Sequence, residues 1–207
     1  MGVVLQTLVL VALAASASAT LMHRGRPRGR FGMLGEPRSE LRMSSRDPQE
    51  HWFVQPLCHF NPAGTDTWKQ RYMVNDEFYR PGGPVFLMFG GEGEASIKWL
   101  TAPTHIMLLA KKFGALVFQL EHRFYGKSWP TKDMSVDNLE YLTSEQALAD
   151  GAAFRDAMVE QYKLGPDSKW VVFGGSYSGS LARLVQAQVP APGRRRRGIQ
   201  RAPVRHH

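Results

Sequence analysis

The chain has 207 residues and a formal net charge of +8, and its length suits one domain with a sizeable core. The positive charge is unevenly distributed, because residues 1–180 hold 19 basic and 18 acidic residues, whereas the sequence from residue 181 onward has seven arginines and no acidic residue. The globular part is therefore near neutral, which argues against nucleic acid or an anionic membrane as its partner.

The first nineteen residues have the composition of a secretory signal peptide, with an apolar core from Val3 to Ala15 and small residues up to Ala19. We expect cleavage after Ala19, and the apolar stretch is too short for a stable membrane span. Residues 20–50 are rich in arginine, glycine and proline, so we expect a disordered basic leader or propeptide. In an oxidising secretory compartment the single cysteine, Cys58, is either a buried thiol or lacks a partner.

The folded domain is expected over residues 51–182, beginning with short strands at Trp52–Gln55 and Arg71–Asn75. Continuous apolar runs follow at Pro84–Phe89 and Gly114–Leu120. Runs of this length without polar alternation are typical of strands that are covered on both faces.

Helices are predicted between and after these runs. The first spans Thr104–Lys112, and the second begins at the capping box Thr143-Ser-Glu-Gln146 and ends at Gly165-Pro166. A last apolar strand, Trp170–Phe173, comes directly after it. This alternation is typical of a parallel-rich sheet with flanking helices, so the predicted fold class is α/β.

The last strand leads through two glycines to Ser176, in the run Gly174-Gly-Ser-Tyr-Ser178. A strand followed by a serine among small residues is typical of the nucleophile elbow of α/β-hydrolases, a tight turn that exposes a catalytic serine. Ser178 stands where the pattern G-x-S-x-G has its second glycine, which adds one hydroxymethyl group to the turn. The sequence therefore predicts Ser176 as a nucleophile.

A glycine-rich loop, Gly90-Gly-Glu-Gly-Glu94, directly follows a buried-type strand. In α/β-hydrolases the loop at this place supplies one backbone N–H of the oxyanion hole, and the residue after the nucleophile supplies the other. We assign these roles to Gly91 and Tyr177, with Glu92 in the pocket. A phosphate-binding loop is the alternative reading, but its glycine spacing and its lysine are absent.

The segment Glu121-His-Arg-Phe-Tyr-Gly126 lies at the carboxyl end of the next strand. We interpret His122 as a structural or pocket-supporting residue, because the base of this fold follows the serine in the sequence. Glu121 and Arg123 are interpreted as an ion pair that shapes the pocket. No ligand spacing predicts a metal site, and no motif predicts a cofactor. After Ser176 the sequence has no acidic residue, and its histidines are His206 and His207.

Together these motifs resemble the serine peptidase family that contains lysosomal Pro-X carboxypeptidase, dipeptidyl peptidase II and thymus-specific serine protease. The resemblance runs from Trp52 to Ala182 and is strongest to the thymus-specific branch, through Gly90-Gly-Glu-Gly93. It implies the amino-terminal part of an α/β-hydrolase domain, a secreted or lysosomal exopeptidase that takes peptides, including proline-containing ones, and Ser176 as the nucleophile. Cys58 stands where the family has an aspartate.

From Arg183 onward the sequence departs from this family. A permitted choice of codons for Arg183 to Ala202, read one base later, translates as a continuation typical of the family, with Trp-Phe-Arg followed by Tyr-Pro-His. We therefore expect residues 183–207 to be an unstructured tail from a shifted reading frame, and this chain to be an inactive fragment without the aspartate and histidine of the triad. A lipase or esterase of the same fold, and a non-enzymatic binding protein, are the alternatives.

Overall fold

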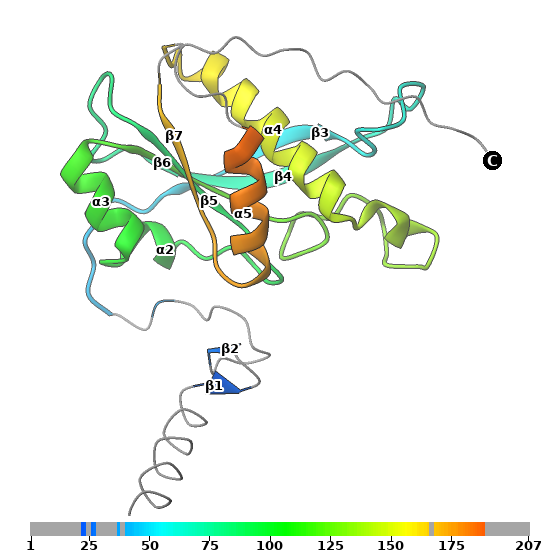
Figure 1. The fold of residues 1–207 in the computed structure, drawn as a ribbon, viewed down its shortest axis with the longest axis horizontal. Helices are drawn as coiled ribbons and strands as arrows, with labels where there is room; N and C mark the ends of the chain where they lie inside the picture. Colours follow the sequence, from blue (N-terminus) through cyan, green and yellow to red (C-terminus); the bar gives the residue numbers. More distant parts are fainter. Residues whose placement is uncertain (1–21, 24–25, 28–36, 38–39, 166–167, 189–207) are drawn as a thin grey trace, which may run out of the picture.

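The computed structural model describes residues 22–23, 26–27, 37, 40–165 and 168–188. The predicted signal peptide, most of the expected leader and the residues after Gln188 lie outside the described residues. The described domain is a five-stranded mixed sheet with helices on both faces, which confirms the predicted fold class (Figure 1). In this part of the chain no helix is long and apolar enough to cross a membrane.

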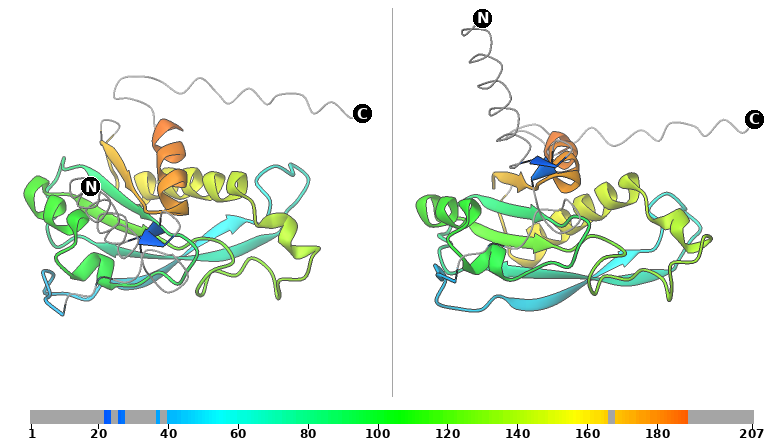
Figure 2. Two further views of the ribbon diagram at one scale, coloured as in Figure 1. Left: turned by 60° about the horizontal axis from the view of Figure 1, so that its bottom comes forward. Right: turned by 90° about the horizontal axis from the view of Figure 1, so that it is seen from below.

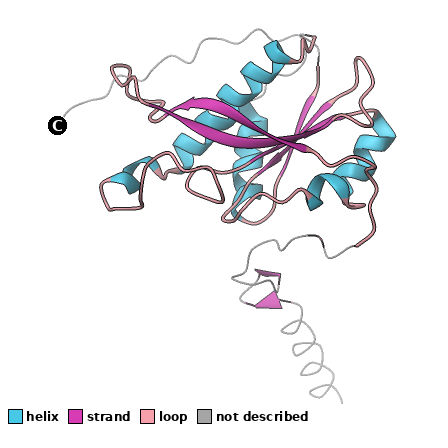
Figure 3. Cartoon of the chain, turned by 180° about the vertical axis from the view of Figure 1, so that it is seen from behind, coloured by secondary structure: helices cyan, strands magenta, loops and turns pink. Residues whose placement is uncertain are grey.

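The sheet has the strand order β3-β4-β6-β5-β7. Its members are β3 (Gln49–Pro56), β4 (Thr67–Asn75), β5 (Val85–Phe89), β6 (Leu116–Leu120) and β7 (Trp170–Phe173). Strand β5 pairs in parallel with both β6 and β7, whereas β4 is antiparallel to β3 and to β6. The long β3–β4 ribbon crosses the view in Figure 3. A short antiparallel pair, β1 (Met22–His23) and β2 (Arg26–Pro27), is separate from this sheet.

The helices divide between the two faces of the sheet. On one face lie α2 (Lys98–Thr101) and α3 (His105–Phe113), and on the other lie α4 (Ser144–Gln161) and α5 (Tyr177–Gln188). Helices α4 and α5 lie next to one another in both views of Figure 2. The short helix η2 (Asn138–Tyr141) precedes α4. As the capping box predicted, the backbone N–H of Gln146 donates to the Thr143 hydroxyl at 3.2 Å.

Two apolar cores result from the alternation of side chains along the central strands. Val85, Leu87 and Phe89 of β5 pack in the core under α4 and α5, whereas Phe86 and Met88 pack in the core under α2 and α3. All residues of β5 and β6 are buried, which confirms the interpretation of their continuous apolar runs. Because β5 is parallel to both β6 and β7, the carboxyl ends of these three strands meet at one edge of the sheet.

The ordered domain extends beyond both boundaries expected from the sequence. In the segment expected to be a disordered leader, the backbone N–H groups of Met43 and Ser44 donate to the Thr101 carbonyl at 2.7 and 3.1 Å, and β3 begins at Gln49. At the other end α5 continues to Gln188, through residues that we had expected to be an unstructured tail. The amino-acid composition of these two segments did not predict that they are ordered. Each segment is held by a few hydrogen bonds or apolar residues, which leave no periodic pattern in the sequence.

Strand β7 lies at the edge of the sheet, and a side chain of α5 covers part of that edge. The Gln186 carboxamide accepts from the Val172 backbone N–H at 2.9 Å and donates to the Trp170 carbonyl at 3.1 Å. Because residues 171 and 173 face β5, these two backbone groups are the ones that point away from the sheet. The Gln186 side chain thus makes hydrogen bonds of the kind that a neighbouring strand would make.

We predict that Phe154→Ala strongly lowers the free energy of unfolding. Phe154 is fully buried, and its ring packs edge-on against Phe53, Tyr72 and Phe118. Loss of such a ring leaves a cavity and costs about 3–5 kcal/mol, which urea denaturation can measure. Leu108→Ala, at a position 52% exposed on α3, serves as the control. Equal losses in the two variants would contradict the assigned core.

Candidate active site

Ser176 lies at the tip of the turn between β7 and α5, where the sequence predicted a nucleophile elbow. Its side chain is exposed, and its φ of 56° is in the left-handed region. That conformation costs a non-glycine residue about 1–2 kcal/mol. In open α/β sheets, ligands commonly bind beyond the carboxyl ends of parallel strands. Ser176 follows the carboxyl end of β7 and therefore lies at such a position.

Close backbone packing explains the glycine two residues before the serine. A Cβ atom on Gly174 would lie 2.3 Å from the Ser178 carbonyl oxygen, a distance that backbone atoms cannot relieve easily. Ser178, which departs from the G-x-S-x-G pattern, closes the same turn. Its buried hydroxyl donates to the Gly175 carbonyl at 2.9 Å and accepts from the Gly175 N–H at 3.1 Å. The extra hydroxymethyl group is therefore accommodated as part of the elbow.

The loop after β5 passes between the end of β6 and the elbow. A Cβ atom on Gly90 would lie 2.7 Å from the His122 backbone nitrogen, so glycine is required for this close approach. A Cβ atom on Gly91 would lie 3.3 Å from the Ser178 hydroxyl oxygen. Gly91 therefore lies beside the elbow, next to Ser178. Tyr177, the other predicted oxyanion donor, directly precedes Ser178 in the sequence.

The Glu121 carboxylate is fully buried and holds two loops of the site in place. It accepts hydrogen bonds from the Arg71 guanidinium (2.6 and 3.2 Å), from the backbone N–H groups of Ala95 (2.9 Å) and Lys127 (3.0 Å), and from the Ser128 hydroxyl (2.7 Å). Ala95 ends the glycine-rich loop, whereas Lys127 and Ser128 belong to the loop after β6. One carboxylate therefore fixes both loops against β4.

The predicted ion pair between Glu121 and Arg123 is wrong, because Glu121 pairs with Arg71. The chain leaves the extended conformation after β6 and turns, with the Tyr125 N–H donating to the His122 carbonyl at 3.2 Å, so residues 121 and 123 face different neighbours. Arg123 is fully buried and binds the Asp150 carboxylate through two hydrogen bonds of 2.7 Å.

Arg123 and Asp150 connect the site to α4. The Arg123 guanidinium also donates to the carbonyls of Leu57 (3.2 Å) and Tyr141 (2.9 Å), and the His59 ring lies 2.7 Å from the Asp150 carboxylate. Asp150 was not predicted as the partner of Arg123, because it stands within a helix 27 residues further along the chain. The pair satisfies two buried charges, as burial of ions requires.

His122 is buried directly beneath the residue that follows the serine. Its Nδ1 lies 2.7 Å from the Arg123 carbonyl oxygen, and its Nε2 lies 3.3 Å from the Tyr177 hydroxyl oxygen. Burial lowers the pKa of His122, more than the nearby charge of Asp150 raises it. The ring therefore contacts the elbow as a neutral group.

Glu92 is exposed on the glycine-rich loop. Its charge acts on His122 and Tyr125, and burial together with this charge raises the pKa of the Tyr125 hydroxyl. The charge of Glu92 therefore acts on both His122 and Tyr125 beside the elbow.

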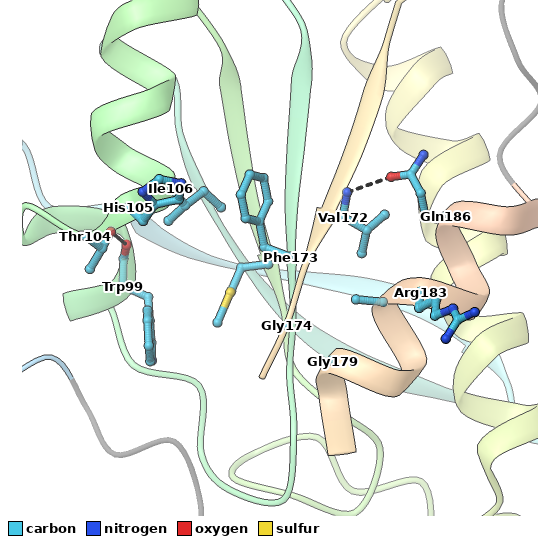
Figure 4. Close-up of a pocket in the computed structure, with 12 residues that line it drawn as sticks. Trp99, Thr104, His105, Ile106, Val172, Phe173, Gly174, Gly179, Arg183 and Gln186 are labelled. Atoms are coloured by element: carbon cyan, nitrogen blue, oxygen red, sulfur yellow. Dashed lines mark hydrogen bonds between the residues drawn. The ribbon is translucent and has the colours of Figure 1, made fainter. Parts of the chain in front are cut away.

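A groove of about 550 Å³ runs along β7, between α3 and α5 (Figure 4). Gly174 and Gly179 of the elbow form part of its wall, and both apolar side chains, including Trp99, Ile106 and Phe173, and polar ones, including His105 and Arg183, line the rest. Ser176 is not among the lining residues. We call this feature the β7 groove; the sequence did not predict it, because it arises from the open edge of the sheet.

Among the described residues, no group of three or more histidine, cysteine, aspartate or glutamate side chains could hold a metal ion. The Cys58 thiol is free, and its sulfur accepts a hydrogen bond from the Gln146 carboxamide at 3.0 Å. The described residues that follow Ser176 include no histidine and no acidic residue. This part of the chain therefore presents a candidate nucleophile and backbone donors without a base placed in the order typical of the fold.

An elbow serine at the edge of a mixed sheet of this strand order defines the α/β-hydrolase class. The model of the serine carboxypeptidase S28 family matches residues 55–192, and the chain belongs to this family of serine peptidases.

Curated relatives are similar to the chain over most of its length. Thymus-specific serine protease of Mus musculus is 44% identical over 145 residues, covering 69% of this chain and 28% of that protein. Lysosomal Pro-X carboxypeptidase of Mus musculus is 35% identical over 144 residues, covering 67% and 29%. A Caenorhabditis elegans protein, K12H4.7, is 47% identical over 171 residues, covering 82% and 34%. The chain thus spans about a third of the length of these relatives.

Among solved structures, a thermostable carboxyl esterase from Bacillus coagulans is similar at 25% identity with a TM-score of 0.44, over 68% of this chain and 40% of that one.

Substitution of the close-packed elbow glycine tests the turn geometry. We expect Gly174→Ala to lower the free energy of unfolding by more than about 2 kcal/mol, because the new Cβ atom would overlap backbone atoms. In Gly165→Ala the added atom meets nothing within 4 Å, so this matched variant should unfold like the original chain. Chemical denaturation followed by circular dichroism measures both, and a harmless Gly174→Ala would refute the tight turn.

Because His122 is buried, we predict that the free energy of unfolding depends on pH. Because burial lowers its pKa in the folded state, the unfolded chain binds more protons just below pH 6.5, the ordinary pKa of histidine. The free energy of unfolding should therefore fall as the pH drops through about 6.5 towards the lower folded-state pKa. Urea titrations between pH 4 and pH 8 should show this decline, reduced in His122→Gln and unchanged in a variant of the exposed His105, His105→Gln.

Proposed function

We propose that the whole protein is a serine-type exopeptidase of the secretory pathway, with Ser176 as the nucleophile. The observation that carries this proposal is the exposed serine held at a positive φ between a parallel strand and a helix. Membership in the serine carboxypeptidase S28 family supports peptides as substrates. Similarity to a lysosomal Pro-X carboxypeptidase supports proline-containing peptides in particular, and an extracellular or lysosomal location.

The proposed reaction follows acyl-enzyme chemistry. The Ser176 hydroxyl oxygen attacks the scissile carbonyl carbon while a histidine takes the hydroxyl proton, and the N–H groups of Tyr177 and Gly91 bind the resulting oxyanion. The histidine then gives the proton to the leaving amine, and water releases the acyl group from the serine by the same steps. An aspartate orients the histidine. We assign both of these residues to a part of the whole protein that the described residues do not include.

The chain as printed is therefore proposed to be inactive by itself. Removal of the base from a triad lowers the rate by several orders of magnitude. We further propose that the sequence from Arg183 onward is read in a shifted frame. In support, Val185 is buried and Leu184 is exposed on α5, and the shifted reading keeps a large apolar residue at each of these positions.

Labelling with a fluorophosphonate probe tests the nucleophile. We expect the probe to modify Ser176 in a longer product of the same transcript, translated in the shifted frame after Ala182. The printed chain should react at least about 1,000-fold more slowly, since it lacks the base. Ser176→Ala should abolish labelling of the longer product.

Ser180→Ala provides the matched control, because Ser180 is an exposed serine on the helix that directly follows Ser176. Labelling should persist in this variant, with mass spectrometry placing the adduct on Ser176. Rapid labelling of the printed chain would contradict the inactive fragment, and an adduct elsewhere would contradict the assigned nucleophile. With the longer product, hydrolysis of ester panels without hydrolysis of X-Pro peptides would favour an esterase instead.

A further inference from the structure

Three hydroxyl and imidazole groups from three different elements meet behind the elbow. The Tyr177 hydroxyl oxygen lies 3.2 Å from the Ser144 hydroxyl oxygen and 3.3 Å from Nε2 of His122. Ser144 is the first residue of α4, Tyr177 is the first residue of α5, and His122 follows β6. The side chain of Tyr177 therefore connects the elbow to both a helix and the sheet.

The direction of each hydrogen bond follows from the chemistry of the groups. The Arg123 carbonyl oxygen can only accept, so Nδ1 of His122 carries a proton and donates to it across 2.7 Å. Burial keeps the ring neutral, which leaves Nε2 as an acceptor. The Tyr177 hydroxyl must then donate to Nε2, and its oxygen accepts from the Ser144 hydroxyl. The result is a directed chain from Ser144 through Tyr177 to His122.

We propose that this chain of hydrogen bonds positions the backbone N–H of Tyr177 as an oxyanion donor, with His122 and Ser144 as positioning residues. The inference rests on the proposed function of the elbow. As the first residue of α5, Tyr177 has a backbone N–H without a partner inside its helix, so this group is available to a ligand. An oxyanion donor is effective only if it is held in place before the reaction.

Packing alone does not account for the arrangement. The Tyr177 ring is only partly buried, and its centroid lies 5.5 Å from that of His122. A phenylalanine would retain this ring contact. It would lose the hydroxyl group that joins Ser144 to His122. The variant Tyr177→Phe therefore distinguishes the effect of the hydrogen bonds from the effect of ring packing.

Nitrogen-15 NMR of the printed chain, uniformly labelled with nitrogen-15, tests the proposal without any need for activity. We expect the His122 resonances to show a protonated Nδ1 and an unprotonated, hydrogen-bonded Nε2, assigned by their loss in His122→Gln. Tyr177→Phe should shift the Nε2 resonance downfield. It should also lower the nitrogen-15 relaxation order parameter of the residue 177 amide below about 0.85, the value of rigid backbone, because the hydrogen bond that holds this residue in place is lost.

Ser144 supplies a matched pair of variants that retain the helix. Ser144→Ala should lower the order parameter of the residue 177 amide, whereas Ser144→Thr, which keeps the hydroxyl, should not. Thermal unfolding of each variant confirms that it is folded. A His122 ring protonated at Nε2, or an order parameter at residue 177 that is unchanged in Tyr177→Phe, would overturn the proposal. Ser176→Ala should leave all these signals in place, so failure of Ser176 as a nucleophile would be seen separately in probe labelling.

Discussion

The buried carboxylate of Glu121 is the interaction on which the geometry of the site depends. It collects the Arg71 guanidinium, two backbone N–H groups and a serine hydroxyl, so its charge is balanced and its oxygens are fully hydrogen-bonded. A buried ion satisfied in this way is stable only while every partner remains in place. The glycine-rich loop and the loop after β6 are therefore fixed relative to one another, and both border the elbow.

A second buried ion pair, between Arg123 and Asp150, also holds parts of the site in place. Arg123 and Asp150 fix the start of α4 relative to the sheet, and α4 in turn carries Ser144 to the Tyr177 hydroxyl. The two pairs flank His122, whose backbone lies against Gly90. The side chains of Glu121, His122 and Arg123 therefore contact β4, the elbow and α4, respectively. A short segment of the sequence therefore connects β4, the elbow and α4.

Local sequence patterns predicted the central strands, the Thr143 cap and the serine turn, because each depends on neighbours in the chain. The apolar runs of β5 and β6 require cover on both faces wherever they lie, and the capping bond joins Thr143 to Gln146. The partners of Glu121 and Arg123 were not predictable in this way. Arg71 and Asp150 are 50 and 27 residues away, and only the turn after β6 decides which charge faces which neighbour. The β7 groove likewise depends on the edge of a sheet whose strand order no local pattern specifies.

The Gln186 carboxamide has a consequence for how this sheet meets other polypeptides. An edge strand invites pairing by any extended segment, since its outward backbone groups need partners. Here the amide of a helix residue already occupies the Val172 N–H and the Trp170 carbonyl. An incoming strand must displace that side chain before it can form its first two bonds to β7. In the chain as printed, a side chain of the domain therefore competes with strand addition, and a single rotamer change at Gln186 separates a closed sheet from one that can be extended.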